Sequence, residues 1–152
     1  MPRHAVVETN VLVSALLKRG SYPDKVAQAV RLGQLQPVVC TEIVAEYVDV
    51  LRRPKLGLPQ HDALELLESF AAQAQWVRIT PYLAALNLPD PDDWPFVATA
   101  LAAECPVITG NTRHFPARLG LEIMTARQWA EIQCRPAHPQ QPPAPASRRR
   151  RD

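Results

Sequence analysis

The sequence lacks several patterns that would quickly assign it to a class of protein. Its apolar runs all fall short of the roughly 18 residues needed to cross a membrane, and its first residues lead straight into a strand pattern rather than a secretory signal. Its three cysteines, Cys40, Cys105 and Cys134, are far apart without CxxC spacing, so we expect free thiols rather than a disulfide framework or a zinc site. These absences predict a cytoplasmic protein with no membrane contact.

Counting charges alone also shows no basic binding face on the main body of the chain. The 152 residues carry a net charge of +2, but residues 1–134 hold 12 Lys and Arg against 14 Asp and Glu, a net charge of −2. The positive excess lies in residues 135–152, which are rich in Pro and Gln and end in four arginines, Arg148 to Arg151. We expect one domain over residues 1–134 and a disordered tail over 135–152. The arginines of the tail could contact RNA phosphates or could simply be solvated.

Two motifs of other phosphate-handling α/β proteins are absent from the first strand–helix turn, which reads Glu8-Thr9-Asn10. Without GxGxxG the turn does not match a dinucleotide-binding fold. Without Asp-x-Asp it does not match a phosphatase that uses an aspartate nucleophile at the first strand. The carboxylate at the end of this strand therefore needs a different explanation.

What the sequence does contain is an alternation of short apolar runs and amphipathic segments. Strands are predicted at residues 5–7, 37–40, 76–79, 106–109 and 121–124. Helices are predicted after Thr9 or Asn10 as a cap, at 24–32, after Thr41 to about 53, at 62–75 with Leu64, Leu67 and Ala71 facing inward, at 96–104, and after Thr125 to about 133. Residues 81–95 are predicted to be a loop with a helical turn. This alternation indicates an α/β fold, a parallel sheet with helices on both faces.

Three carboxylates fall where such a sheet opens its ligand crevice. Glu8 follows the first strand, Glu46 borders the apolar stripe of the helix after the second strand, and Asp93 precedes a buried helix. Each has a simpler explanation: a solvated strand end for Glu8, a surface position for Glu46, and a helix cap for Asp93, although Asp90 or Asp92 could serve as that cap. Because like carboxylates repel unless a cation lies among them, their grouping favours a hard ion such as Mg²⁺ or Mn²⁺. Such ions stabilise phosphoryl oxygens and activate water, which makes phosphoester chemistry plausible.

The order and spacing of these pieces resemble a PIN domain, and within that superfamily the toxin ribonucleases of VapBC-type toxin–antitoxin pairs. The matches extend from about residue 4 to about residue 130. The matching segments are residues 6–16 (VVETNVLVSAL), where the family has Asp-Thr-Asn, then Glu46-Tyr47, residues 51–54 (LRRP), Asp93 before residues 97–101 (VATAL), and residues 107–115 (VITGNTRHF).

The resemblance implies a three-layer α/β/α sandwich with a central parallel sheet of about five strands. It also implies a metal-dependent endoribonuclease that uses Mg²⁺ or Mn²⁺ to hydrolyse RNA, a homodimer, and an antitoxin partner that covers the acidic groove. By this resemblance Glu8, Glu46 and Asp93 would be catalytic and would bind the metal together with Asn111. The supporting or substrate-binding residues would be Thr9, Asn10, Ser14, Thr109, Arg113 and His114.

Two departures from the family pattern bear on activity. Glu8 replaces the usual Asp and is one methylene longer, which octahedral Mg²⁺ geometry at about 2.1 Å tolerates poorly. The family commonly has a fourth acid at the position of Asn111 or of His114, and this chain has neither; His114 could be a ligand, a phosphate contact or a surface residue. The alternative to an active nuclease is therefore a PIN-fold protein that binds RNA or a partner and cuts weakly or not at all.

Overall fold

The centre of the molecule is a parallel sheet built from short, buried apolar strands. The computed structural model describes residues 4–80 and 87–133. Its five strands are β1 (His4–Val7), β2 (Gln36–Val39), β3 (Gln75–Trp76), β4 (Val107–Ile108) and β5 (Ile123–Met124), in the order β3-β2-β1-β4-β5. All pairs are parallel, with Val6 opposite Val107 and Val7 opposite Ile108. The predicted α/β fold with about five parallel strands is confirmed, although several strands are shorter than predicted.

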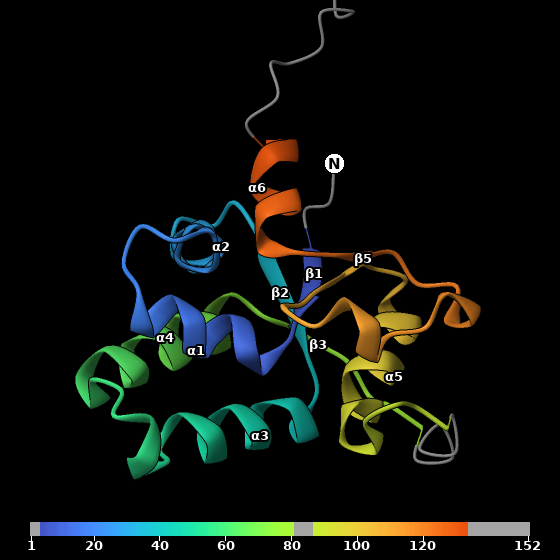
Figure 1. The fold of residues 1–152 in the computed structure, drawn as a ribbon, viewed down its shortest axis with the longest axis horizontal. Helices are drawn as coiled ribbons and strands as arrows, with labels where there is room; N and C mark the ends of the chain where they lie inside the picture. Colours follow the sequence, from blue (N-terminus) through green and yellow to red (C-terminus); the bar gives the residue numbers. More distant parts are fainter. Residues whose placement is uncertain (1–3, 81–86, 134–152) are drawn as a thin grey trace, which may run out of the picture.

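Helices cover the sheet on both sides, as expected for parallel strands joined by crossovers. They are α1 (Thr9–Leu17), α2 (Tyr22–Arg31), α3 (Thr41–Leu51), α4 (Gln60–Gln73), α5 (Trp94–Ala103) and α6 (Ala126–Gln133). Short 3-10 turns occupy η1 (Pro54–Leu56), η3 (Pro91–Asp93), η4 (Thr112–His114) and η5 (Ala117–Leu119). Figure 1 shows α5 to one side of the sheet and α1, α2 and α4 to the other. Among the described residues, no helix is long and apolar enough to cross a membrane.

Two of the predicted helix caps are wrong and one is confirmed. The cap position of α1 is Glu8, not Thr9 or Asn10, and Thr41 lies inside α3, whose cap position is Cys40. Neither cap residue makes a side-chain cap hydrogen bond. Thr125 does cap α6: its hydroxyl accepts from the Gln128 N–H at 3.0 Å, and its own N–H donates to the Gln128 side chain at 2.8 Å. This reciprocal pair is a capping box.

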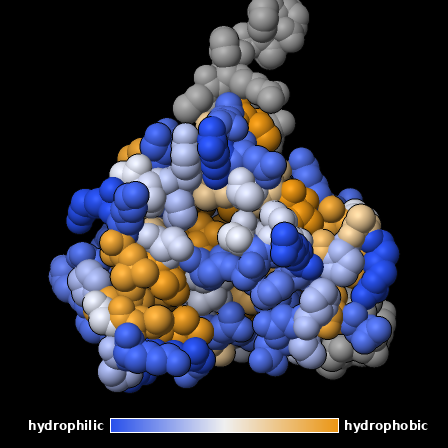
Figure 2. All heavy atoms as spheres, in the orientation of Figure 1, coloured by the Kyte–Doolittle hydropathy of each residue, from blue (hydrophilic) through white to orange (hydrophobic). Residues whose placement is uncertain are grey.

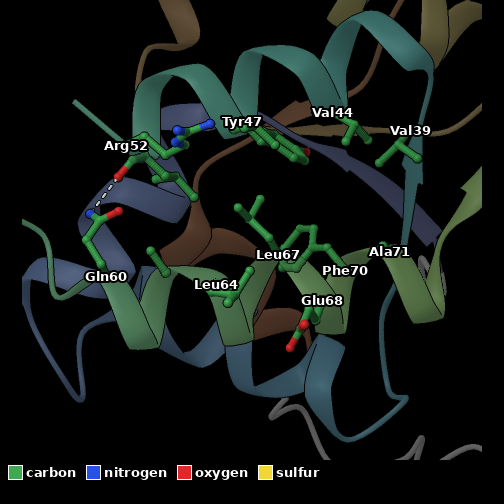
Figure 3. Close-up of a pocket in the computed structure, with 13 residues that line it drawn as sticks. Val39, Val44, Tyr47, Arg52, Gln60, Leu64, Leu67, Glu68, Phe70 and Ala71 are labelled. Atoms are coloured by element: carbon green, nitrogen blue, oxygen red, sulfur yellow. Dashed lines mark hydrogen bonds between the residues drawn. The ribbon is translucent and has the colours of Figure 1, made fainter.

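The inward face of α4 was predicted on the wrong stripe. The buried residues of α4 are Ala63, Leu66 and Phe70, whereas Leu64 is 56% exposed. The predicted stripe of Leu64, Leu67 and Ala71 instead lines an apolar groove of about 570 Å³ between α3 and α4 (Figure 3). Both stripes are apolar and both have helical spacing, so periodicity alone could not choose between them. The choice is made by packing, because Phe70 meets the ring of Tyr47 edge-on at 5.9 Å.

The other sequence predictions are met in part. Phe96, Val97 and Ala100 of α5 are buried, but Leu101 is 37% exposed and does not belong to the core stripe. Cys40 and Cys105 are buried free thiols. Cys134, the whole Pro-rich tail (135–152) and part of the loop predicted at 81–95 lie outside the described residues.

Candidate active site

The adjacency of β1 and β4 brings together two polar residues that lie 101 positions apart. Glu8 follows β1 and its N–H donates to the carbonyl of Ile108 at 2.9 Å, which extends the strand pairing by one residue. Thr109 follows β4, and its hydroxyl donates to Oε1 of Glu8. The side-chain amide of Asn10 donates to the same oxygen at 3.0 Å. Two neutral donors thus hold the Glu8 carboxyl group at the carboxyl edge of the sheet.

The turn after β4 is fastened to the start of α1. The N–H of Asn111 donates to the Thr109 hydroxyl at 2.8 Å, and the N–H of Gly110 donates to Oδ1 of Asn10 at 3.1 Å. A Cβ at Gly110 would lie 3.4 Å from that oxygen, an ordinary van der Waals distance, so the turn packs directly against the Asn10 side chain. The turn therefore fixes both donors that hold Glu8, and Asn111 takes part through its backbone while its side chain is exposed.

Helix α3 carries the second predicted carboxylate into the same site. The hydroxyl of Tyr47, which is fully buried, donates to the carbonyl of Val7 at 2.5 Å, so α3 is attached to the end of β1. The neighbouring residue Glu46 accepts a hydrogen bond from the Thr9 hydroxyl on Oε2, also at 2.5 Å. Thr9 therefore supports Glu46, while Asn10 supports Glu8.

The third carboxylate is freed from capping by its neighbour. Asp90 accepts a hydrogen bond from the N–H of Asp92 at 3.0 Å and so caps the 3-10 turn, whereas Asp93 makes no side-chain cap bond. Oδ2 of Asp93 lies 3.0 Å from Nδ1 of His114. Glu8 and Asp93 are each only 5% exposed, and the side chain of His114 is 31% exposed. Asp93 thus occupies the predicted cap position of α5, but its carboxylate does not serve as a cap.

These residues share an open groove of about 800 Å³ that follows the carboxyl edge of the sheet. Ligand atoms of Glu8, Asp93 and His114 all lie within 4.8 Å of one another, and no other group of this kind occurs among residues 4–80 and 87–133. Figure 2 shows a hydrophobic patch over the region of α1. Eight of the ten predicted site residues line this groove: Glu8, Thr9, Asn10, Ser14, Glu46, Asp93, Asn111 and His114. Of the other two, Thr109 is hydrogen-bonded to Glu8 and Arg113 is exposed on η4.

The sequence analysis missed three further acids on the same groove, Asp49, Asp90 and Asp92. From the sequence, Asp93 was the only predicted metal ligand in the run Asp90-Pro91-Asp92-Asp93, and Asp90 and Asp92 were considered only as helix caps. In the structure all three of its carboxylates face one space. The concentration of aspartate in that loop was the available signal.

Burial and crowding change the acidity of these groups. Burial, together with the nearby carboxyl of Glu8 and a hydrogen bond to it, raises the pKa of Asp93 from its ordinary value to about 8. Burial also raises the pKa of Glu46, and the charges of Glu8, Asp92 and Asp90 add to that effect, while the Thr9 hydroxyl opposes it. In the absence of a cation, both shifts favour the protonated, neutral forms of these carboxyl groups.

The residues present fit a divalent cation. The closely grouped ligand atoms comprise carboxylate oxygens and one imidazole nitrogen, all of them donor types found in protein metal sites. A doubly charged ion would satisfy the charge that crowding and burial penalise. Glu46 lies on the same groove but outside this tight group.

The fold and the site together define an α/β protein with an acidic, cation-fitting groove at the carboxyl edge of its sheet. The family model described as PIN domain matches residues 4–113, so the chain belongs to the PIN-domain family. Its structure is similar to the crystal structure of FitAcB from Neisseria gonorrhoeae, with a TM-score of 0.56 and 18% sequence identity over 81% of this chain and 98% of that chain. At this identity the similarity shows the fold alone. No curated protein sequence matches the chain.

The raised pKa of Asp93 predicts an unusual pH dependence for the metal-free protein. Because the folded state holds a proton that the unfolded state releases above a pH of about 3.9, the free energy of unfolding should fall as pH rises toward about 8. The slope from this one group is at most about 1.4 kcal/mol per pH unit. Urea unfolding of the wild type and of Asp93→Asn, with chelator present, measures it. The two proteins should diverge with pH, and equal slopes would contradict the shift.

Proposed function

We propose that this protein is a metal-dependent endoribonuclease of the PIN type. The observation that carries the proposal is the pair of buried carboxyl groups, Glu8 and Asp93, whose ligand atoms lie with that of His114 within 4.8 Å at the carboxyl edge of the sheet. PIN domains are generally metal-dependent nucleases, and ligands of parallel α/β sheets bind at this edge.

The side chains suggest a division of labour around such a site. Glu8 and Asp93 would hold Mg²⁺ or Mn²⁺, with Glu46 and Asn111 close enough to the groove to complete the ligand set directly or through water. A bound ion would stabilise the charge on phosphoryl oxygens and promote ionisation of an attacking water. Thr109 and Asn10 fix the orientation of Glu8, and Thr9 fixes that of Glu46. The open groove leaves room for a nucleic-acid strand to pass across these residues.

The finer biological role follows from the sequence resemblance to VapC-like toxins. On that basis the substrate is RNA, the partner is a cognate antitoxin that covers the acidic groove, and the protein forms a homodimer. The charge of the groove supports the partner: it is lined by six carboxylates, so an inhibitory segment carrying Lys or Arg would be complementary to it.

The alternative is a PIN-fold protein that binds RNA or a partner but cuts poorly. Two observations favour it: Glu8 stands where the family has Asp, and Asn111 offers only a neutral side chain where an acid is common. Cleavage assays separate the two functions.

A cleavage assay on single-stranded RNA with Mn²⁺ tests the nuclease directly. We expect Asp93→Asn to lower the rate by at least about 100-fold, since even residues behind metal ligands cost 10–100-fold. Asp62→Asn, on α4 away from this groove, is the matched control and should cut normally. Equal rates for the wild type and Asp93→Asn would support the binding-only alternative.

The length of Glu8 predicts a dependence on the metal used. Because Mg²⁺ demands near-ideal octahedral geometry, shortening this side chain with Glu8→Asp should raise Mg²⁺-supported cleavage more than Mn²⁺-supported cleavage. The ratio of the two rates, measured for both proteins, is the readout. An unchanged ratio would mean that the geometry of Glu8 does not limit activity, and that Thr109 and Asn10 already hold its carboxylate where it is needed.

A further inference from the structure

His114 occupies the place in this site where an acid is absent. It ends the short turn η4, and its N–H donates to the carbonyl of Asn111 at 3.0 Å, which holds the residue over the groove. Its ring turns Nδ1 toward Asp93, at 3.0 Å from Oδ2. The same nitrogen belongs to the group of ligand atoms that includes a carboxylate oxygen of Glu8.

This spacing suits a metal ion as well as it suits a hydrogen bond. Two ligand atoms that lie at right angles about 2.1 Å from an ion are about 3 Å apart, which matches the separation of Asp93 and His114. The same separation is that of a hydrogen bond between the two groups. A cation could lie between them with little movement of either side chain.

We propose that Nδ1 of His114 is a metal ligand, and that Glu8, Asp93 and His114 form a mixed oxygen–nitrogen triad that prefers transition-metal ions to Mg²⁺. The inference rests on the proposed function, in which this groove holds the catalytic ion. Imidazole suits first-row transition metals, whereas Mg²⁺ prefers sites made of oxygen alone. Replacing the fourth acid by histidine therefore lowers the negative charge of the site and shifts its metal preference together.

Isothermal titration calorimetry of the full chain with Co²⁺, Mn²⁺ and Mg²⁺ tests this assignment. We expect His114→Ala to weaken Co²⁺ binding by at least about 10-fold and to change Mg²⁺ binding far less. The visible absorption spectrum of bound Co²⁺ should also change, because a nitrogen ligand is lost. His61→Ala, an exposed histidine on α4, is the matched control and should alter neither. An unchanged preference for Co²⁺ over Mg²⁺ in His114→Ala, or no metal binding by the wild type, would overturn the inference.

A second variant distinguishes a ligand from a residue that only orients Asp93. His114→Asn keeps a side chain able to donate a hydrogen bond but removes the imidazole nitrogen. If Asn restores Co²⁺ affinity and its spectrum, His114 is a positioning residue and the ligand assignment is wrong. If Co²⁺ binds through His114 but RNA is not cut, the nuclease proposal fails and the triad stands. If RNA is cut but the metal preference does not change in His114→Ala, the nuclease proposal stands and the ligand assignment fails.

A separate cluster of an aromatic ring and two cations lies next to the groove. Tyr22 begins α2 and its ring is 38% exposed. Nζ of Lys25 lies 5.2 Å from the ring centroid, and Cζ of Arg127, from the first turn of α6, lies 5.7 Å from it. Arg127 also pairs with Glu131 at 3.1 Å, but an exposed pair of this kind is weak and leaves the guanidinium available.

The cluster borders a small, mainly apolar pocket of about 230 Å³ that is adjacent to the acidic groove. Tyr22 and Arg127 line the pocket, and Asn10 and Ser14 line both the pocket and the groove. A strand of RNA that crosses the groove can therefore continue into the pocket. The positive charge of Lys25 and Arg127 would offset part of the repulsion between phosphates and the carboxylates of the groove.

We infer that this pocket is a nucleotide-binding subsite for the RNA substrate, in which Lys25 and Arg127 leave the ring of Tyr22 to contact the flanking phosphate and a base stacks on the ring face that they vacate. Stacking on aromatic rings combined with positive charge is how proteins hold single-stranded nucleic acids. The inference rests on the proposed function for the substrate and is independent of which metal the site binds.

Fluorescence anisotropy with a labelled single-stranded oligoribonucleotide measures this contact without cleavage, in the full-length Asp93→Asn protein. On that background Tyr22→Ala should weaken binding by about 10-fold, while Tyr22→Phe, which keeps the ring, should bind like the parent. Arg127→Ala should reduce the salt dependence by about one phosphate contact. Arg52→Ala, on the α3–α4 groove, is the matched control and should leave the salt dependence of RNA binding unchanged.

The outcomes separate the subsite from the nuclease. Equal affinities for Tyr22→Ala and Tyr22→Phe, or no binding of RNA by the parent, would overturn the subsite. If binding depends on Tyr22 but the wild-type chain cuts no RNA, the nuclease proposal fails and the subsite remains. If the wild type cuts RNA and Tyr22→Ala leaves its KM unchanged, the subsite is wrong and the nuclease remains.

Discussion

Mutual repulsion among carboxyl groups is the constraint around which this structure is built. Six of them line one groove, and two, Glu8 and Asp93, are almost fully buried. The donors that the structure shows on Glu8, Thr109 and Asn10, are neutral, so they fix its position without cancelling its charge. A fold selected only for stability would avoid this arrangement. A cation bound in the groove would offset the free-energy cost of burying these carboxyl groups close together.

The parallel sheet makes this concentration of charge possible. β1 lies at the centre of the sheet, and its neighbours β2 and β4 end at the same edge, so the residues that follow each strand meet although they are distant in sequence. Helix α3 begins directly after β2 and carries Glu46 inward. The loop before α5 delivers Asp93 from the other side. The central strands β1, β2 and β4 are short but almost completely buried, whereas β3 at the edge of the sheet is exposed.

The sequence predicted the fold and the three central carboxylates because both depend on local patterns: buried apolar runs, helical spacing and the position of an acid at a strand end. It could not predict contacts that depend on how distant segments meet. The pairing of His114 with Asp93 is one such contact, and the support of Glu46 by Thr9, a residue predicted as a possible cap, is another. The prediction for the inward face of α4 was wrong for a related reason. The helix has two apolar stripes, and the one that is buried contains Phe70, which packs against the distant ring of Tyr47.

Tyr47 belongs to two regions of the molecule at once. Its ring forms part of the wall of the apolar groove between α3 and α4, shown in Figure 3, while its hydroxyl holds the last carbonyl of β1, one residue before Glu8. Tyr47 is only 1% exposed, and its ring also packs edge-on against Phe70 of α4. The contact between α3 and α4 and the position of the strand end that carries Glu8 therefore depend on one buried side chain.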